Sequence, residues 1–142
     1  MALIDDEIKY KSRDTLLTPT ECAFWQVLNK IVPRTAMACP KVRVSDLVKA
    51  CTWKYAVHNR LNQKHFDFVL INAMTGEILG VVELDDPSHV RRDRLERDQL
   101  LDEVLAKAGI EILRVEAQNQ YSLDALAHRI ELLIAKSQKE AA

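Results

Sequence analysis

The chain has 142 residues, of which 48% are hydrophobic and 29% charged, and its formal net charge is −1. A chain of this length can form one domain whose core needs no covalent staples. It contains no apolar run of about 18 residues, the length that would indicate a membrane span. The acidic start MALIDDEIKY is unlike a secretory signal, and the three cysteines share no CxxC spacing. We therefore expect a cytoplasmic domain with neither a membrane partner nor a small-molecule cofactor.

The first predicted element is a helix that follows an irregular start. Thr18 can cap the helix, Pro19 suits its first position, Glu21 completes a capping box, and Pro33 ends it. We expect three parts in all: an N-terminal arm over 1–16, one domain over 17–137 and a C-terminal tail over 138–142.

Strands are predicted next. Val42 and Val44 alternate with basic residues, which indicates a strand that starts at Pro40 or has Pro40 on a sheet edge. Residues 49–64 follow no firm pattern, which indicates a loop or a short irregular helix. The mostly apolar segments 65–71 and 78–85 then predict a central hairpin.

The last part of the chain alternates helix and strand. Residues 92–108 carry one apolar stripe that ends at Gly109, residues 110–115 form a strand, and Ser122 caps a final helix. A strand, a crossover helix and another strand predict a parallel pair. The expected fold class is therefore α/β, with a mixed central sheet flanked by helices.

Acidic residues interrupt the predicted hairpin where apolar residues are expected. Alternation places Glu83 and Asp85 on one face of their strand, and Asp67 opposite or diagonal to Glu83 on its neighbour. Carboxylates that share a patch resist ionisation unless a cation joins them. Mg²⁺ prefers oxygen ligands, so this pattern predicts a metal centre for phosphodiester hydrolysis. The alternative is a structural role, in which the acids pair with nearby arginines: Arg91, Arg92, Arg94, Arg97 or Arg114.

A basic segment precedes the first of these strands. No acidic residue lies between Asp46 and Asp67, whereas Lys54, Arg60 and Lys64 lie within this stretch. Such a segment suits an anionic polymer, although a solvated basic loop has the same composition.

The pattern FDFVL, a turn, VVELDDPSH, the helix RRDRLERDQLLDEVL and then AGIEILRV resembles a bacterial family of unknown function. That family is placed in the PD-(D/E)XK, or restriction-endonuclease-like, superfamily near the very-short-patch-repair endonuclease clade. The resemblance spans about Leu17 to Leu133. It implies that Asp67, Glu83 and the Leu84 carbonyl bind the metal and that Glu21 of the first helix reaches the site.

The sequence departs from the superfamily pattern at one position. Asp85 occupies the place of the motif's lysine, so the usual ammonium group is missing. His89 resembles a histidine that related families carry after this strand, and it could act as general base or simply lie near a helix start. Arginines that follow could bind phosphate or form a solvated face: Arg91, Arg92 and Arg97.

These features together predict a DNA endonuclease that depends on Mg²⁺ or Mn²⁺, or a DNA-processing module derived from such a nuclease. A non-catalytic nucleic-acid-binding module and a protein-interaction domain with paired acids remain alternatives. The substrate sequence, its strandedness and the oligomeric state are left open by the sequence.

Overall fold

A computed structural model describes the chain over residues 5–86 and 92–140, without the side chains of 92–98, 139 and 140. Its centre is a four-stranded mixed sheet in the order β1-β2-β3-β4. The strands are β1 (Ala36–Arg43), β2 (His65–Asn72), β3 (Ile78–Asp85) and β4 (Ile112–Glu116). β1, β2 and β3 pair antiparallel, and β3 pairs parallel with β4. The mixed sheet and its parallel pair are therefore confirmed.

The central hairpin forms as predicted from its turn. The Asn72 side chain accepts hydrogen bonds from the amides of Met74 and Thr75, at 2.9 and 3.1 Å. Gly76 adopts φ +77°, a conformation that residues with a Cβ rarely take. The pairing shifts by one residue between Leu70 and Ile71, and beyond this shift Phe68 of β2 lies opposite Val82 of β3.

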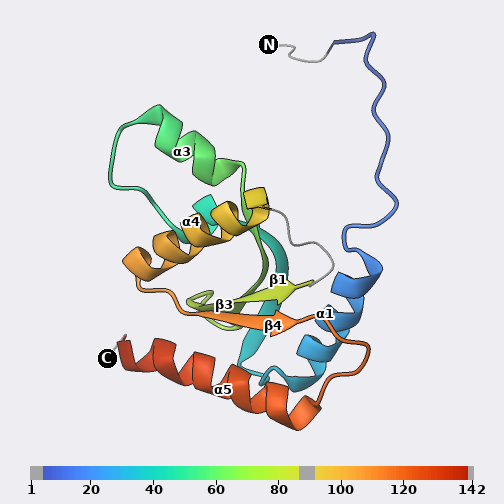
Figure 1. The fold of residues 1–142 in the computed structure, drawn as a ribbon, viewed down its shortest axis with the longest axis vertical. Helices are drawn as coiled ribbons and strands as arrows, with labels where there is room; N and C mark the ends of the chain where they lie inside the picture. Colours follow the sequence, from blue (N-terminus) through green and yellow to red (C-terminus); the bar gives the residue numbers. More distant parts are fainter. Residues whose placement is uncertain (1–4, 87–91, 141–142) are drawn as a thin grey trace.

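Helices cover both faces of the sheet (Figure 1). They are α1 (Pro19–Ile31), α2 (Val44–Leu47), α3 (Tyr55–Asn62), α4 (Arg92–Ala108) and α5 (Leu123–Glu140). α1 and α5 pack against one face, and α2, α3 and α4 pack against the other. None of the helices in the described part of the chain is long and apolar enough to cross a bilayer.

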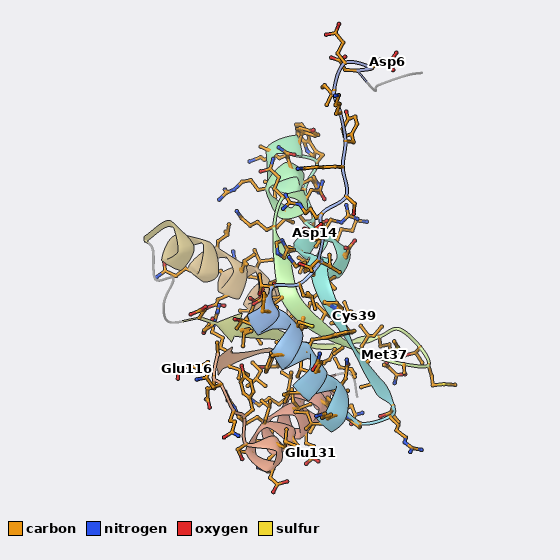
Figure 2. All side chains as sticks on the ribbon, turned by 90° about the vertical axis from the view of Figure 1, so that its right-hand side faces the viewer. Asp6, Asp14, Met37, Cys39, Glu116 and Glu131 are labelled. Atoms are coloured by element: carbon orange, nitrogen blue, oxygen red, sulfur yellow. The ribbon has the colours of Figure 1, made fainter. Side chains whose placement is uncertain are left out.

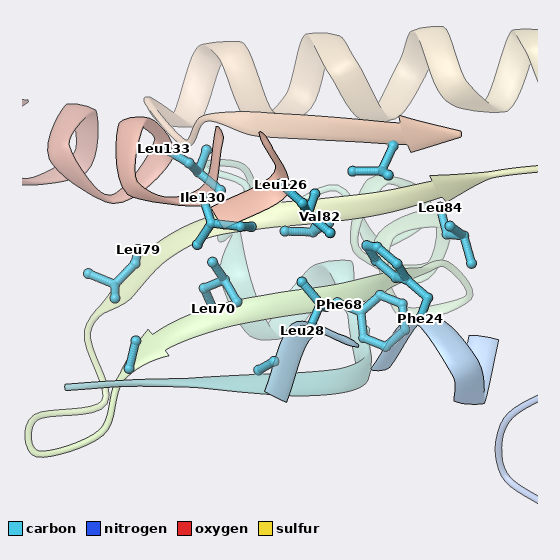
Figure 3. Packing of buried hydrophobic residues seen from close by; sticks show 13 residues of the cluster. Phe24, Leu28, Phe68, Leu70, Leu79, Val82, Leu84, Leu126, Ile130 and Leu133 are labelled. Atoms are coloured by element: carbon cyan, nitrogen blue, oxygen red, sulfur yellow. The ribbon is translucent and has the colours of Figure 1, made fainter. Parts of the chain in front are cut away.

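The larger core lies between the sheet, α1 and α5 (Figure 3). The rings of Phe24 and Phe68 meet edge to face with centroids 5.4 Å apart. α5 approaches β3 closely at Gly80, where an added Cβ would lie 2.8 Å from Leu133 Cγ. This close contact explains why glycine is needed inside a buried strand.

A smaller core fills the opposite face. Val69 of β2 and Val81 of β3 pack there with Val44 of α2, Leu61 of α3 and Leu105 of α4. In β3, Val82 and Leu84 pack in the larger core, so Glu83 between them lies on the face shared with these three helices, and Asp67 lies beside it on β2.

Both edge strands have a carbonyl that a side chain protects. Trp25 Nε1 donates to the Ala38 carbonyl of β1 at 3.3 Å, and Arg129 donates to the Arg114 carbonyl of β4 at 2.8 Å. These contacts occupy groups that would otherwise be open to pairing with another chain.

The expectation for the first strand was wrong in its bounds. β1 begins at Ala36, runs through Pro40 and ends at Arg43, while Val44 opens α2. Pro40 is tolerated because β1 is an edge strand, as its composition had suggested. Residues 49–64, which follow no firm pattern in the sequence, contain the short helix α3, which buries Leu61.

The segment before α1 extends away from the body of the protein, with Asp6 near its far end (Figures 1 and 2). It forms no helix or strand over the described residues 5–18. α1 itself begins as predicted, with the complete capping box between Thr18 and Glu21.

Candidate metal centre

Asp67 and Glu83 stand across from each other on the two central strands. Phe68 pairs with Val82, so the next step along the antiparallel register brings Asp67 opposite Glu83. Both carboxyl groups are partly buried. The facing arrangement expected for these two acids is therefore present.

The two carboxyl groups join the strands where the backbone pairing ends. The Asp67 amide donates to Glu83 Oε1 at 3.2 Å, and the Leu84 amide donates to Asp67 Oδ2 at 2.9 Å. The ladder between β2 and β3 runs only as far as Phe68 and Val82. The amides of Asp67 and Leu84 are thus bonded to side-chain oxygens. If the backbone pairing had continued, they would have been bonded to backbone carbonyls.

Glu83 is held in an environment that opposes its negative charge. The pKa of its carboxyl group is raised from 4.5 to about 9, first because burial disfavours the charged form and then because Asp67 lies beside it. A hydrogen bond between the two carboxyl groups acts in the same direction, whereas the Asp67 amide and the charge of Arg114 lower the pKa. Near neutral pH, Glu83 therefore retains a proton that an ordinary glutamate would have lost.

Arg114 balances the charge next to this pair. It lies opposite Glu83 in the parallel ladder between β3 and β4. Its guanidinium group contacts Asp85 Oδ1 at 3.2 Å and Asp102 Oδ1 of α4 at 2.7 Å. Asp85 is thus on the same side as Glu83, and its charge is shared with an arginine. Asp102 was not anticipated, because its partner is twelve residues away on another element.

The oxygen atoms beside this pair suit a hard cation that takes only some of its ligands from the protein. Among the residues that the structure describes, no three His, Cys, Asp or Glu side chains are grouped to hold a metal ion. Asp67 and Glu83 supply two carboxyl groups. The Asp85 carbonyl accepts from the Ala117 amide on the β4 side, so the Leu84 carbonyl is directed toward β2. Two carboxylates and a carbonyl match Mg²⁺, which usually keeps several water ligands.

Glu21 has a defined role at the start of its own helix. Its Oε1 accepts from the Thr18 amide at 2.8 Å, and α1 packs on the sheet face opposite to the acid pair. Among the described contacts, Glu21 is not brought to Asp67 or Glu83.

The remaining predicted residues fall into two groups. Lys54 and Arg60 are exposed on and just before α3, and Lys64 is half-buried between α3 and β2. His89 and Arg91 lie outside the described residues, as do the side chains of Arg92 and Arg97.

A family model described as "Protein of unknown function (DUF2726)" matches residues 13–133, which include α1, the whole sheet and most of α5. The chain belongs to the DUF2726 family. No curated protein and no solved structure matches it. The description of DUF2726 names no activity, so the acid pair itself is the basis for a functional proposal.

Proposed function

We propose that this DUF2726 chain is a metal-dependent nuclease that hydrolyses phosphodiester bonds in DNA on a restriction-endonuclease-like core. The observation that carries the proposal is the facing pair Asp67 and Glu83, with the pKa of Glu83 raised to about 9. A partly buried pair of acids lowers the stability of the fold, because an apolar pair would fill the same space without electrostatic repulsion. A bound cation would remove that cost.

In this proposal Asp67, Glu83 and the Leu84 carbonyl hold Mg²⁺ or Mn²⁺. Such an ion supplies Lewis acidity toward the phosphate and lowers the pKa of a bound water. The hydrogen bonds from the Asp67 and Leu84 amides fix the orientation of both carboxyl groups before any ligand arrives. The pair is therefore preorganised on two central strands rather than on a loop.

The position of the missing lysine is the main departure from the PD-(D/E)XK pattern. Arg114 brings a positive charge beside Glu83 and Asp85. We propose that Arg114 supplies this charge balance. An arginine does not give up its proton, so proton transfer is assigned to His89.

A second candidate is a DNA-binding module that has the same core and no catalysis. Asp85 favours it, because it occupies the position of the motif's lysine, and a core without that lysine could bind DNA and not cut it. The two candidates share the metal site and differ in whether DNA is cut.

The test is a cleavage assay with Mg²⁺ or Mn²⁺ on single-stranded, duplex and nicked DNA. The variants are Asp67→Asn, Glu83→Gln and His89→Ala, with Glu131→Gln as a matched control. Glu131 is exposed on α5, on the other side of the sheet (Figure 2). We expect cleavage by the wild type and the control, loss in the two acid variants, and a decrease of about 10²–10⁴-fold in His89→Ala. Absence of wild-type cleavage on every DNA would favour the binding module.

A further inference from the structure

Two aromatic side chains stand almost fully in solvent next to the acid-bearing face. Trp53 is 93% exposed just before α3, and Tyr55 is 80% exposed at the first position of this helix. A tryptophan usually buries most of its large apolar surface, so the near-complete exposure of Trp53 marks a candidate binding surface.

The charged residues along the segment that carries these rings are all basic. The segment from Leu47 to Phe66 contains no acidic residue. Lys49, Lys54 and Arg60 are exposed there, and Lys64 is half-buried. Lys54 lies directly between the two aromatic residues, so the composition alternates ring, cation, ring. This combination suits a ligand that has flat apolar faces along a chain of negative charges.

The basic segment 47–66 lies close to Asp67 and Glu83, both in the packing of the core and along the chain. Leu61 anchors α3 in the smaller core with Val69 and Val81, on the face that carries Asp67 and Glu83. Lys64 precedes Asp67 by three residues, which is about 10 Å along an extended chain. In Figure 1, α3 lies on the same side of the sheet as α4 and away from α5.

We propose that Trp53 and Tyr55 stack on unpaired bases while Lys54, Arg60 and Lys64 bind the adjacent phosphates, so that the favoured substrate is DNA with a single-stranded segment. In an intact duplex the base faces are covered by their neighbours, whereas single strands offer them to aromatic side chains. The inference deepens the proposed function, since the choice of nucleic acid as partner rests on it. It adds a substrate class and a second set of residues.

The test measures binding by the full chain in the presence of EDTA, so that neither metal nor cleavage is required. The probes are a labelled single strand of about 20 nucleotides, longer than the roughly 4–16 nucleotides that one small module covers, and the matching duplex. The variants are Trp53→Ala, Trp53→Phe and Lys54→Ala/Arg60→Ala/Lys64→Ala. Met74→Ala is the control, because Met74 is 89% exposed at the other end of the hairpin.

We expect the wild type to prefer the single strand and Trp53→Ala to weaken this binding about 5- to 100-fold, the range typical of one lost base–aromatic stack. Trp53→Phe should retain most of the affinity because it keeps an aromatic face. The triple variant should reduce the salt dependence of binding, whereas Trp53→Ala should leave it unchanged. Met74→Ala should bind as the wild type does.

Equal binding of duplex and single strand, or an unchanged affinity in Trp53→Ala, would overturn the inference. Failure to bind either probe would also overturn it. These outcomes are separate from the nuclease assay. If Trp53-dependent binding to the single strand occurs without cleavage, the stacking site stands and the catalytic proposal fails.

Discussion

The Leu84 amide donates a hydrogen bond to the Asp67 carboxylate over 2.9 Å, and the Asp67 amide donates in turn to Glu83. Side chains therefore close the central strand pair where its backbone ladder ends. This arrangement fixes two acids in place and leaves Glu83 with its pKa raised to about 9.

The first prediction concerns the pH dependence of stability without metal. The pKa of Glu83 is about 9 in the folded protein against an ordinary value of 4.5, so between these values the folded state holds a proton that the unfolded state has released. Stability should therefore decrease as pH rises from about 5 to 9, by up to about 1.4 kcal/mol per pH unit.

Urea unfolding at several pH values in EDTA measures this slope. Glu83→Gln mimics the protonated side chain and should make the stability less dependent on pH, whereas Glu131→Gln should behave as the wild type does. A wild-type stability that increases across this range would contradict the assignment of the proton to Glu83.

The second prediction concerns Arg114, which links Asp85 on β3 to Asp102 on α4. Arg114→Gln removes the positive charge that lowers the pKa of Glu83, so this pKa should rise further. The stability cost should be only about 1 kcal/mol, because the three side chains are partly solvated. NMR titration of the Glu83 carboxyl carbon measures the pKa. An unchanged or lower pKa in Arg114→Gln would show that the guanidinium group does not act on Glu83.

The third prediction concerns the contact between α5 and β3. Gly80→Ala would place a Cβ 2.8 Å from Leu133 Cγ, and we expect it to destabilise the protein by about 1–3 kcal/mol. Leu133→Ala alone should also be destabilising because it leaves a cavity. The double variant should be less destabilised than the sum of the two, since each change relieves the other. Strict additivity in thermal unfolding would show that the two positions do not compete for space.

The acid pair could be anticipated in part from two local features. The turn around Gly76 predicts the hairpin, and alternation predicts that Asp67 lies opposite or diagonal to Glu83. The one-residue shift between Leu70 and Ile71, which the sequence does not announce, brings the two acids directly opposite each other. The proton on Glu83 was foreseen only as a general resistance of clustered acids to ionisation. Its extent depends on burial in the folded protein, which no local pattern specifies.

Other parts depend on contacts between distant segments. Pro40 suggested either a strand start or an edge position, and the second is confirmed, because an edge strand can continue through a proline where no amide partner is needed. α3 was unclear because it buries only Leu61 fully and so lacks an apolar stripe. The exposure of Trp53 was missed for the same reason, although an aromatic residue in a segment without periodicity is a signal for it.

The most direct test of the metal site is calorimetric titration of Mn²⁺ into the protein at pH 7 in two buffers that differ in ionisation enthalpy. Glu83 holds a proton at this pH, and a carboxylate ligand must be deprotonated, so binding should release about one proton per metal ion. Glu131→Gln should do the same, whereas Glu83→Gln should bind weakly and release none. Saturable binding by the wild type without proton release, or equal binding by Glu83→Gln, would contradict a metal site at Asp67 and Glu83.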